Sequence, residues 1–365
     1  MQIKHLTDND VIQWNEFVAE EPLFGLLQSW EWGEFKKELG WKVFRIAVNN
    51  DRGCIIAGAQ MLIKPLPSGL ASMAYIPRGP IGNWLDKELA EKLIPELQRI
   101  VHLYKTAFLT IEPPLLCSKE VEQQIQQLGF RPSRYTNQPN ATIVINIDQT
   151  LDDILLQMRK KTRQYIRSAV REGITIRAGS QEDLPAYYEL MRATGHRNHF
   201  PARSQEYYER QWQIFSKSSN CILLMAFLQD QLLAVRAIYC FGKHAAEFHA
   251  GSLPHNSNLH PNYLLVWEAI QWAKVQGCST YDLWGIPTEV GNIVSEGNYP
   301  PTIKRMDGLW GVYQFKSGFS KNIISYVGAY DYVFQPRLYS LLSNRFVRGD
   351  TLDRAMTWMD SIRWK

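Results

Sequence analysis

Residues 223–250, LLMAFLQDQLLAVRAIYCFGKHAAEFHA, decide the fold of this chain. Three short apolar runs lie within them, at residues 223–227, 232–239 and 246–250. The turn-forming pairs Gln229-Asp230 and Gly242-Lys243 separate these runs, and apolar runs that end at turn residues predict β-strands. A helical period follows at 262–276 and another apolar run at 280–283. The segment therefore predicts the order β-β-β-α-β.

The same order occurs earlier in the chain. Apolar runs and a helical period stand at residues 44–48, 55–63, 74–76, 87–104 and 107–111. The matching elements lie about 172 to 179 residues apart, without residue-level identity between the copies. A β-β-β-α-β order resembles the core of the N-acetyltransferase (GNAT-like) fold. We therefore predict an α/β (α+β) chain with two GNAT-like domains in tandem.

The chain length also favours two domains. With 365 residues it exceeds the size at which a single hydrophobic core keeps growing. Residues 326–334 are strand-like and follow the completed second copy. We predict a first domain of residues 1–148 with 326–365, and a second domain of residues 149–325.

Composition narrows the class of protein. The chain is 45% hydrophobic and 21% charged, which is typical of a soluble globular protein. No apolar run reaches the roughly 18 residues of a membrane span, and the first residues do not resemble a signal peptide. The five cysteines and eight histidines show no metal-ligand spacing. We expect a cytoplasmic protein with no metal and no cofactor.

Residues 150–173 carry the strongest local charge pattern, although the net charge is only +4. Thr150 can cap a helix and Gly173 can end it, so we predict one helix. Its basic face includes Lys160 and Lys161 and arginines at every fourth position, namely Arg159, Arg163, Arg167 and Arg171. Such a face is often simply solvated, but like charges repel, and a phosphate-rich partner would relieve the repulsion.

Several motifs resemble one known family. Residues 138–148 lead into Lys161-x-Arg163-x-x-Ile166-Arg167-x-Ala169. Other motifs are Gln28-x-x-x-Trp32-x-x-x-Lys36, Pro77-Arg78-Gly79-Pro80, Ile111-Glu112-Pro113, Thr194-x-x-Arg197, Tyr281-Asp282-Leu283-x-Gly285 and Tyr313-x-Phe315-Lys316-x-Gly318-Phe319. Their order and spacing resemble the FemABX family of aminoacyl-tRNA-dependent peptidoglycan peptidyltransferases. No heptad run lies between residues 220 and 316, so the chain resembles the FemX-like members, which lack a coiled-coil arm.

The resemblance implies an aminoacyltransferase of cell-wall synthesis. In the reaction it implies, the stem-peptide amine of a peptidoglycan precursor attacks the ester of an aminoacyl-tRNA and forms an interpeptide bridge. The expected partners are therefore an aminoacyl-tRNA and a UDP-linked or lipid-linked muropeptide. We also expect a monomer that makes peripheral contact with the membrane.

The resemblance also implies roles for single residues. Lys36 and Arg197 correspond to ligands of the muropeptide diphosphate, and Tyr281 to a further substrate-binding residue. Lys36 is predicted late in a helix capped by Ser29, where a lysine also complements the helix dipole. Arg197 is predicted in a surface loop.

Lys316 and Glu112 are the implied catalytic residues. Lys316 follows residues 312–315, whose alternation predicts a strand, and corresponds to a lysine that stabilises the tetrahedral state. Glu112 ends an apolar strand and would orient the attacking amine or act as a base, although related enzymes more often have aspartate there. The four arginines of residues 150–173 would bind the tRNA.

Two other functions compete with this one. A GNAT-type N-acyltransferase acting on another amine shares the fold, but it needs a loop of backbone amides to hold the CoA pyrophosphate. Pro77, Pro80 and Pro254 remove amides from the corresponding loops. An RNA-binding module would use the arginines alone and would not need Lys36, Glu112 or Lys316.

Overall fold

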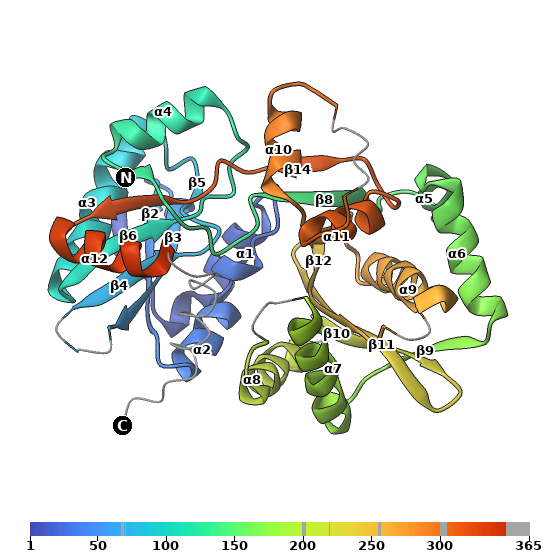
Figure 1. Cartoon of the computed structure of the whole chain (residues 1–365). Helices are drawn as coiled ribbons and strands as arrows, with labels where there is room; N and C mark the ends of the chain where they lie inside the picture. Colours follow the sequence, from blue (N-terminus) through green and yellow to red (C-terminus); the bar gives the residue numbers. More distant parts are fainter. Residues whose placement is uncertain are drawn as a thin grey trace. The chain divides into compact units, whose positions relative to one another are not determined.

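Two compact units make up the protein. The computed structural model describes residues 1–66, 69, 71–198, 202–218, 220–254, 257–299 and 305–347. The first unit comprises Met1–Asn140 and the chain from Ser325 on, and the second comprises Ala141–Ile324 (Figure 1).

A mixed sheet of eight strands organises the first unit. Its strands are β1 (Gln2–His5), β2 (Lys42–Asn49), β3 (Ile55–Pro65), β4 (Ser72–Ile76), β5 (Ile81–Gly82), β6 (Thr106–Ile111), β7 (Arg131–Pro132) and β15 (Tyr330–Val333). The order is β1-β2-β3-β4-β6-β15-β7, and β5 pairs with β3. Among the described residues of this sheet, β4 and β6 form a parallel pair, and the other strand pairs are antiparallel. The helices of this unit are η1 (Asp8–Asp10), α1 (Val11–Ala19), η2 (Leu26–Gln28), α2 (Trp30–Glu38), α3 (Lys87–Leu103), α4 (Lys119–Gln127) and α12 (Pro336–Val347).

A sheet of seven strands organises the second unit. Its order is β14 (Ile323–Ser325), β8 (Ala141–Asn146), β13 (Thr280–Gly285), β12 (His244–Ser252), β11 (Gln231–Phe241), β10 (Cys221–Leu228) and β9 (Ile174–Ala178). Here β12 and β13 form the parallel pair. The helices are α5 (Leu151–Gln157), α6 (Lys160–Arg171), η3 (Gln181–Asp183), α7 (Leu184–Arg197), α8 (Gln205–Phe215), η4 (Ser216–Ser218), η5 (Ser257–Leu259), α9 (Pro261–Val275), α10 (Thr288–Ser295) and α11 (Leu309–Lys316).

The two sheets repeat one arrangement. The elements β2, β3, β4, α3 and β6 recur in the same order as β10, β11, β12, α9 and β13. In both copies the strand before the long helix pairs in parallel with the strand after it, as a βαβ unit requires. The predicted tandem of two GNAT-like folds is therefore confirmed.

The predicted boundary between the domains needs a correction. Residues 141–148 were expected in the first domain, but β8 pairs antiparallel with β13 in the second sheet. Its buried Ile143 and Ile145 join the second hydrophobic core, which moves the boundary to Asn140. The returning chain contributes β15, which pairs with β6 and β7. The remainder of the predicted returning segment, residues 348–365, lies outside the described residues.

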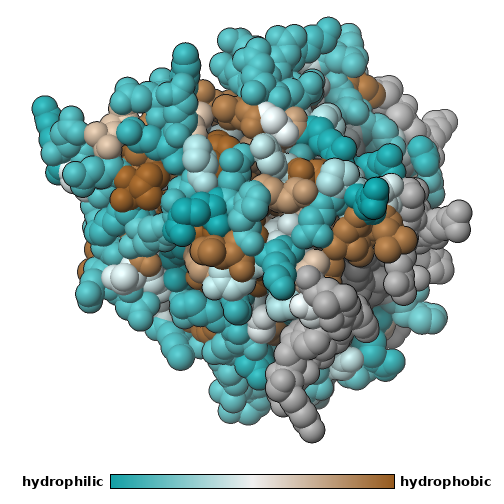
Figure 2. Space-filling view, turned by 90° about the vertical axis from the view of Figure 1, so that its left-hand side faces the viewer, coloured by the Kyte–Doolittle hydropathy of each residue, from teal (hydrophilic) through white to brown (hydrophobic). Residues whose placement is uncertain are grey.

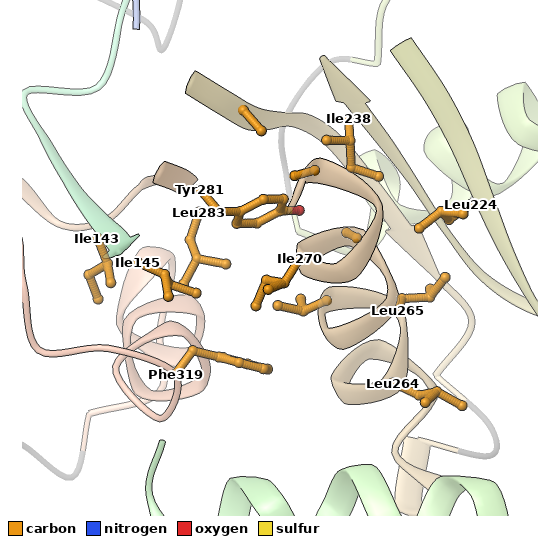
Figure 3. Close-up of a cluster of buried hydrophobic side chains, with 14 of the residues drawn as sticks. Ile143, Ile145, Leu224, Ile238, Leu264, Leu265, Ile270, Tyr281, Leu283 and Phe319 are labelled. Carbon is orange, nitrogen blue, oxygen red and sulfur yellow. The ribbon is translucent and has the colours of Figure 1, made fainter. Parts of the chain in front are cut away.

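A long helix covers each sheet. Residues that recur at helical spacing along α9, among them Leu265, Ala269 and Ile270, are buried against the second sheet, and this apolar face is why the segment forms a helix. In Figure 3, Leu265 and Ile270 of α9 lie among Ile238, Tyr281 and other strand residues. The helix α3 covers the first sheet in the same way, with Leu93 and Leu97 fully buried. Both cores are layers of buried hydrophobic side chains that hold the strand ends in place.

The molecular surface is mixed in character. The face drawn in Figure 2 is mainly hydrophilic, and its hydrophobic residues form small separate groups. Among the described residues, we find no helix that combines the length and the hydrophobicity needed to span a bilayer.

Asp331 of β15 should be essential for the stability of the first unit. Its carboxylate is buried and accepts hydrogen bonds from the hydroxyls of Thr110 (2.5 Å) and Tyr339 (2.8 Å). Asp331→Ala leaves both donors buried and unpaired, so we expect a loss of about 1–3 kcal/mol in the free energy of unfolding. Hydrogen exchange followed by mass spectrometry should show faster exchange in β6 and unchanged exchange in β13. The exposed Asp152→Ala is the control, and unaltered exchange in β6 would mean that the returning chain does not stabilise this unit.

Candidate active site

Lys316 is the last residue of α11 and its side chain is buried. The strand expected at residues 312–315 is wrong, because these residues are helical. Trp310, Tyr313 and Lys316 are the buried residues of α11, and a spacing of three places them on one face of a helix. The apparent alternation arose from too short a window to distinguish the two periods.

The Lys316 amine lies against the end of β13. Its Nζ donates hydrogen bonds to the carbonyl oxygens of Trp284 (3.1 Å) and Gly285 (2.9 Å). The pKa of Lys316 is lowered from 10.5 to about 8, mainly by burial; the charge of Glu247 opposes this shift, that of Arg236 adds to it, and that of Asp282 opposes it. At neutral pH an amine with a pKa of about 8 is mostly protonated, so the site holds a cation in a water-poor environment.

The backbone around Trp284 is shaped to present these carbonyls. Trp284 has a φ of 63°, a left-handed value that is rare for a bulky residue. The Asp282 carboxylate accepts the Trp284 N–H at 2.7 Å and the hydroxyl of Thr142 from β8. The Asp282 carboxylate and the Thr142 hydroxyl on the neighbouring strand thus stabilise the strained turn whose carbonyls bind Lys316.

A buried ion pair lies beside Lys316 in the same unit. The Arg236 guanidinium of β11 donates to the Glu247 carboxylate of β12, and each side chain is only 4% exposed. The Tyr281 hydroxyl donates to the same carboxylate at 3.3 Å, and burial raises the pKa of Tyr281 well above its usual value. The structure thus places Tyr281, which the resemblance assigns to substrate binding, in a fully buried position from which it contacts Glu247.

Glu112 lies in the first unit, directly after β6, and is also buried. One carboxylate oxygen accepts the Tyr75 hydroxyl, and the other accepts the backbone N–H groups of Asn137 and Gln138. Burial raises the pKa of Glu112 above its usual value. These bonds give Glu112 an anchoring role for the segment that precedes β8, and its catalytic role stays a prediction.

Lys36 occupies the expected helix in the first unit. Ser29 caps α2 by accepting the Trp32 N–H at 3.1 Å, as predicted. The Lys36 side chain is 4% exposed, and its Nζ lies 5.4 Å and 5.3 Å from the ring centres of Trp32 and Phe35. The neighbouring Lys37 instead pairs with Glu34 at the surface. A ligand role for Lys36 and Arg197 at one diphosphate stays a prediction.

Arg197 is exposed at the end of α7 in the second unit. The predicted loop is wrong at this position, because α7 continues through Arg197. Its guanidinium donates to the Ser252 carbonyl at 2.7 Å, which ties the helix end to the end of β12. An arginine at a helix C-terminus also complements the helix dipole, which favours this extension.

The predicted arginine-rich helix is in fact two helices. Extended backbone at Met158 and Arg159 separates α5 from α6, and the Arg159 N–H donates to the Gly318 carbonyl at 2.9 Å. Arg163 donates to the carbonyls of Leu156 (3.0 Å) and Met158 (2.7 Å), so it caps the C-terminus of α5. Arg159, Arg167 and Arg171 are exposed, as a phosphate-binding face requires.

One polar and aromatic cluster was not predicted from the sequence. Tyr207, Tyr208 and Gln211 of α8 pack around His249 of β12, and the His249 Nε2 lies 3.1 Å from the Gln211 Oε1. Burial and the nearby Arg203 lower the pKa of His249 to about 3. The Gln211 amide nitrogen is buried without a hydrogen-bond partner among the described residues. The aromatic pair at residues 207–208 was the available signal, but only the fold brings it to His249.

Among the described residues, no group of three His, Cys, Asp or Glu side chains could hold a metal ion.

Solved structures show the same fold. A crystal structure of FemX matches with a TM-score of 0.80 and 21% sequence identity, covering 94% of this chain and 100% of that chain. A tandem GNAT protein from the clavulanic acid biosynthesis pathway matches with a TM-score of 0.53 and 11% identity, covering 90% of this chain and 97% of that chain. At these identities the likeness concerns the fold alone.

Similarity in sequence, unlike similarity in fold alone, can identify a family. The lipid II:glycine glycyltransferase of Staphylococcus aureus (strain COL) is 29% identical over 240 residues, which are 63% of this chain. The match spans 56% of that protein's length. The model of the FemAB family matches residues 10–232 and 224–344. This protein therefore belongs to the FemAB family.

Proposed function

We propose that this protein is an aminoacyltransferase that moves an amino acid from an aminoacyl-tRNA to the stem-peptide amine of a peptidoglycan precursor. Membership of the FemAB family supports the class of reaction, and the S. aureus relative is named for glycyl transfer to lipid II. The observation that carries the proposal is the buried Lys316 amine at the end of β13.

The chemistry follows from that amine. The acceptor nitrogen attacks the carbonyl carbon of the donor ester, and the carbonyl oxygen becomes an oxyanion. The bond to the ribose oxygen of the tRNA then breaks, the amide bond remains, and the ribose oxygen takes up a proton. Lys316 uses two of its three N–H groups on backbone carbonyls, which leaves one for the oxyanion.

No covalent intermediate is needed, because the aminoacyl ester is already activated. The enzyme must instead hold two large substrates in attack geometry, and such positioning can supply roughly 7–11 kcal/mol of the barrier. We assign acceptor binding to Lys36 and Arg197, whose positive charges suit the diphosphate of a UDP-linked or lipid-linked muropeptide. The choice between these two acceptors stays open.

We assign tRNA binding to the exposed side of α6. Arg167 and Arg171 are exposed, and within the described residues neither forms an ion pair, so both can meet backbone phosphates. Arg159 lies at the start of the same helix. Arg163 contributes mainly by holding α5 against α6.

The alternative is a GNAT-type N-acyltransferase that uses acetyl-CoA. Pro77, Pro80 and Pro254 argue against it, since the loops that would hold the pyrophosphate lack those amides. An RNA-binding module without catalysis would leave the buried Lys316 unexplained. A cytoplasmic location, a monomeric state and peripheral contact with the membrane stay predictions that follow from the proposed substrates.

Lys316→Met should lower the turnover number by about 100- to 1000-fold, as loss of an oxyanion donor does. Lys36→Met should instead raise the Michaelis constant for the acceptor by about 10- to 100-fold, because it removes one charged contact to the diphosphate. The assay combines the purified chain with a panel of charged tRNAs and with lipid II or UDP-muropeptide, and mass spectrometry detects the product.

The exposed neighbours provide matched controls. Lys321→Met and Lys37→Met remove the same charge close to each site and should leave both constants within about twofold. Full activity of Lys316→Met would remove the catalytic assignment. Product formed from acetyl-CoA and no product from any charged tRNA would favour the alternative function.

Reversing the charge at Arg167 and Arg171 together should weaken tRNA binding and its salt dependence. Each phosphate contact contributes about −0.7 to −0.9 to the slope of log K against log salt concentration. We therefore expect Arg167→Glu with Arg171→Glu to make the slope shallower by about 1.4–1.8 in filter-binding titrations. Lys87→Glu with Lys119→Glu changes the net charge equally in the first unit and is the control. Equal slopes for the two double variants would mean that the basic face of α6 is merely solvated and does not bind tRNA.

A further inference from the structure

The strongest unexplained feature of the second unit is the buried Arg236–Glu247 ion pair. Removing two charges from water is costly, and a buried pair is usually no more stabilising than packed hydrophobic residues. This pair is also incompletely satisfied, because the Arg236 Nε is buried without a hydrogen-bond partner among the described residues. The pair therefore calls for an explanation other than stability.

Its position supplies one. Arg236 lies on β11 opposite Ala250, Glu247 lies on β12 opposite Ile238, and a register shift separates these two pairings. A β-bulge of this kind redirects side chains, and here it lets two neighbouring strands contribute opposite charges to one buried group. The Arg236 guanidinium also lies 5.4 Å from the ring centre of Phe315, the residue that precedes Lys316. The charge of Glu247 raises the pKa of Lys316 and the charge of Arg236 lowers it.

We propose that Arg236, Glu247 and Tyr281 are positioning residues of the Lys316 site, in which the ion pair sets the charge around the amine and Tyr281 orients the Glu247 carboxylate. Glu247 favours the ammonium form that the oxyanion needs. Arg236 limits that preference, so that the amine is not tied to Glu247 by too strong an attraction. The inference rests on the proposed function, because it assigns these residues to the protonation of a catalytic lysine.

The charged groups that act on the amine, within the part of the chain that the structure describes, fit this account. Glu247 from β12 and Asp282 from β13 raise the pKa of Lys316, and Arg236 from β11 lowers it. Asp282 is already engaged by Thr142 and by the Trp284 N–H. The Arg236–Glu247 pair is therefore the part of the environment that can be altered without disturbing the turn at Trp284.

The two charges make opposite predictions for the pH profile. Transfer needs protonated Lys316, so kcat/KM should fall as the pH rises through the pKa of this amine. Glu247→Gln removes the stabilising negative charge and should move this fall to lower pH by about one unit or more. Arg236→Met removes the opposing positive charge and should move it to higher pH. Arg236→Met with Glu247→Met removes both charges and should return it close to the wild-type position.

The profile is measured for transfer from a charged tRNA to lipid II, at subsaturating acceptor. The ion pair Arg177–Asp183, whose arginine is exposed and whose aspartate is half-buried, provides a control, and Asp183→Asn should not move the profile. Glu247→Asp should recover most of the wild-type profile. A merely structural role would lower activity in all single variants without shifts in opposite directions, and that result would overturn the inference. The double variant guards against misfolding, because hydrophobic replacement of a buried pair is well tolerated.

A second measurement separates this inference from the proposed function. The Nζ resonance of Lys316 is followed by NMR in protein labelled with 15N-lysine and is assigned with Lys316→Met. Opposite shifts of its titration in the two single variants would support the inference even if no aminoacyl transfer were found. An unchanged titration in an active enzyme would overturn the inference and leave the proposed function intact.

Discussion

The candidate active site depends on the pairing of β8 with β13. This pairing places Val144 opposite Asp282 and Thr142 opposite Gly285, with a register shift between the two. The Thr142 hydroxyl then reaches the Asp282 carboxylate, which also holds the strained backbone of Trp284. The carbonyls that bind the Lys316 amine follow directly from that turn. The first strand of the second unit, β8, thus completes the site.

Each sheet is completed by a strand that is distant in sequence, and this explains why the first unit is discontinuous. In each sheet the strand that follows the long helix, β6 or β13, has an antiparallel neighbour from a distant part of the chain. For β13 this neighbour is β8, which precedes the core of the second unit in the chain. For β6 it is β15, which follows the second unit in the chain. An unpaired edge at either strand would leave backbone N–H and C=O groups without partners. The first unit therefore needs a strand that follows the second unit in the chain, and the second unit needs a strand that precedes its own core.

The charges of the second unit cost stability and serve the site. Two cations, Lys316 and Arg236, are buried near two carboxylates, Glu247 and Asp282, where desolvation is expensive. Burial is also what makes the Lys316 ammonium an effective partner for a developing oxyanion, since water no longer screens it. Proteins commonly accept such local costs at functional sites. The hydrophobic packing of α9 against the same sheet provides the stability that the polar cluster lacks.

The sequence by itself determined the order of strands and helices, their duplication and the resemblance to the FemAB family. These properties depend on local periodicity and turn residues, which can be recognised from positions close together in the sequence. The same local signals failed at Lys316 and Arg163. Lys316 lies in a helix that the packing of one buried face stabilises. Arg163 caps α5 across a break between two helices that the apolar periodicity does not indicate.

Only the tertiary structure decided which strand closes each sheet and which charges surround Lys316. Arg236, Glu247 and Lys316 are separated by up to 80 residues, and although the family motif identifies Lys316, no local pattern brings Arg236 and Glu247 to it. Their burial, and with it the lowered pKa of the lysine, arises only when β11, β12 and α11 pack together. Desolvation and charge interactions depend on distance in space, which a sequence pattern does not contain.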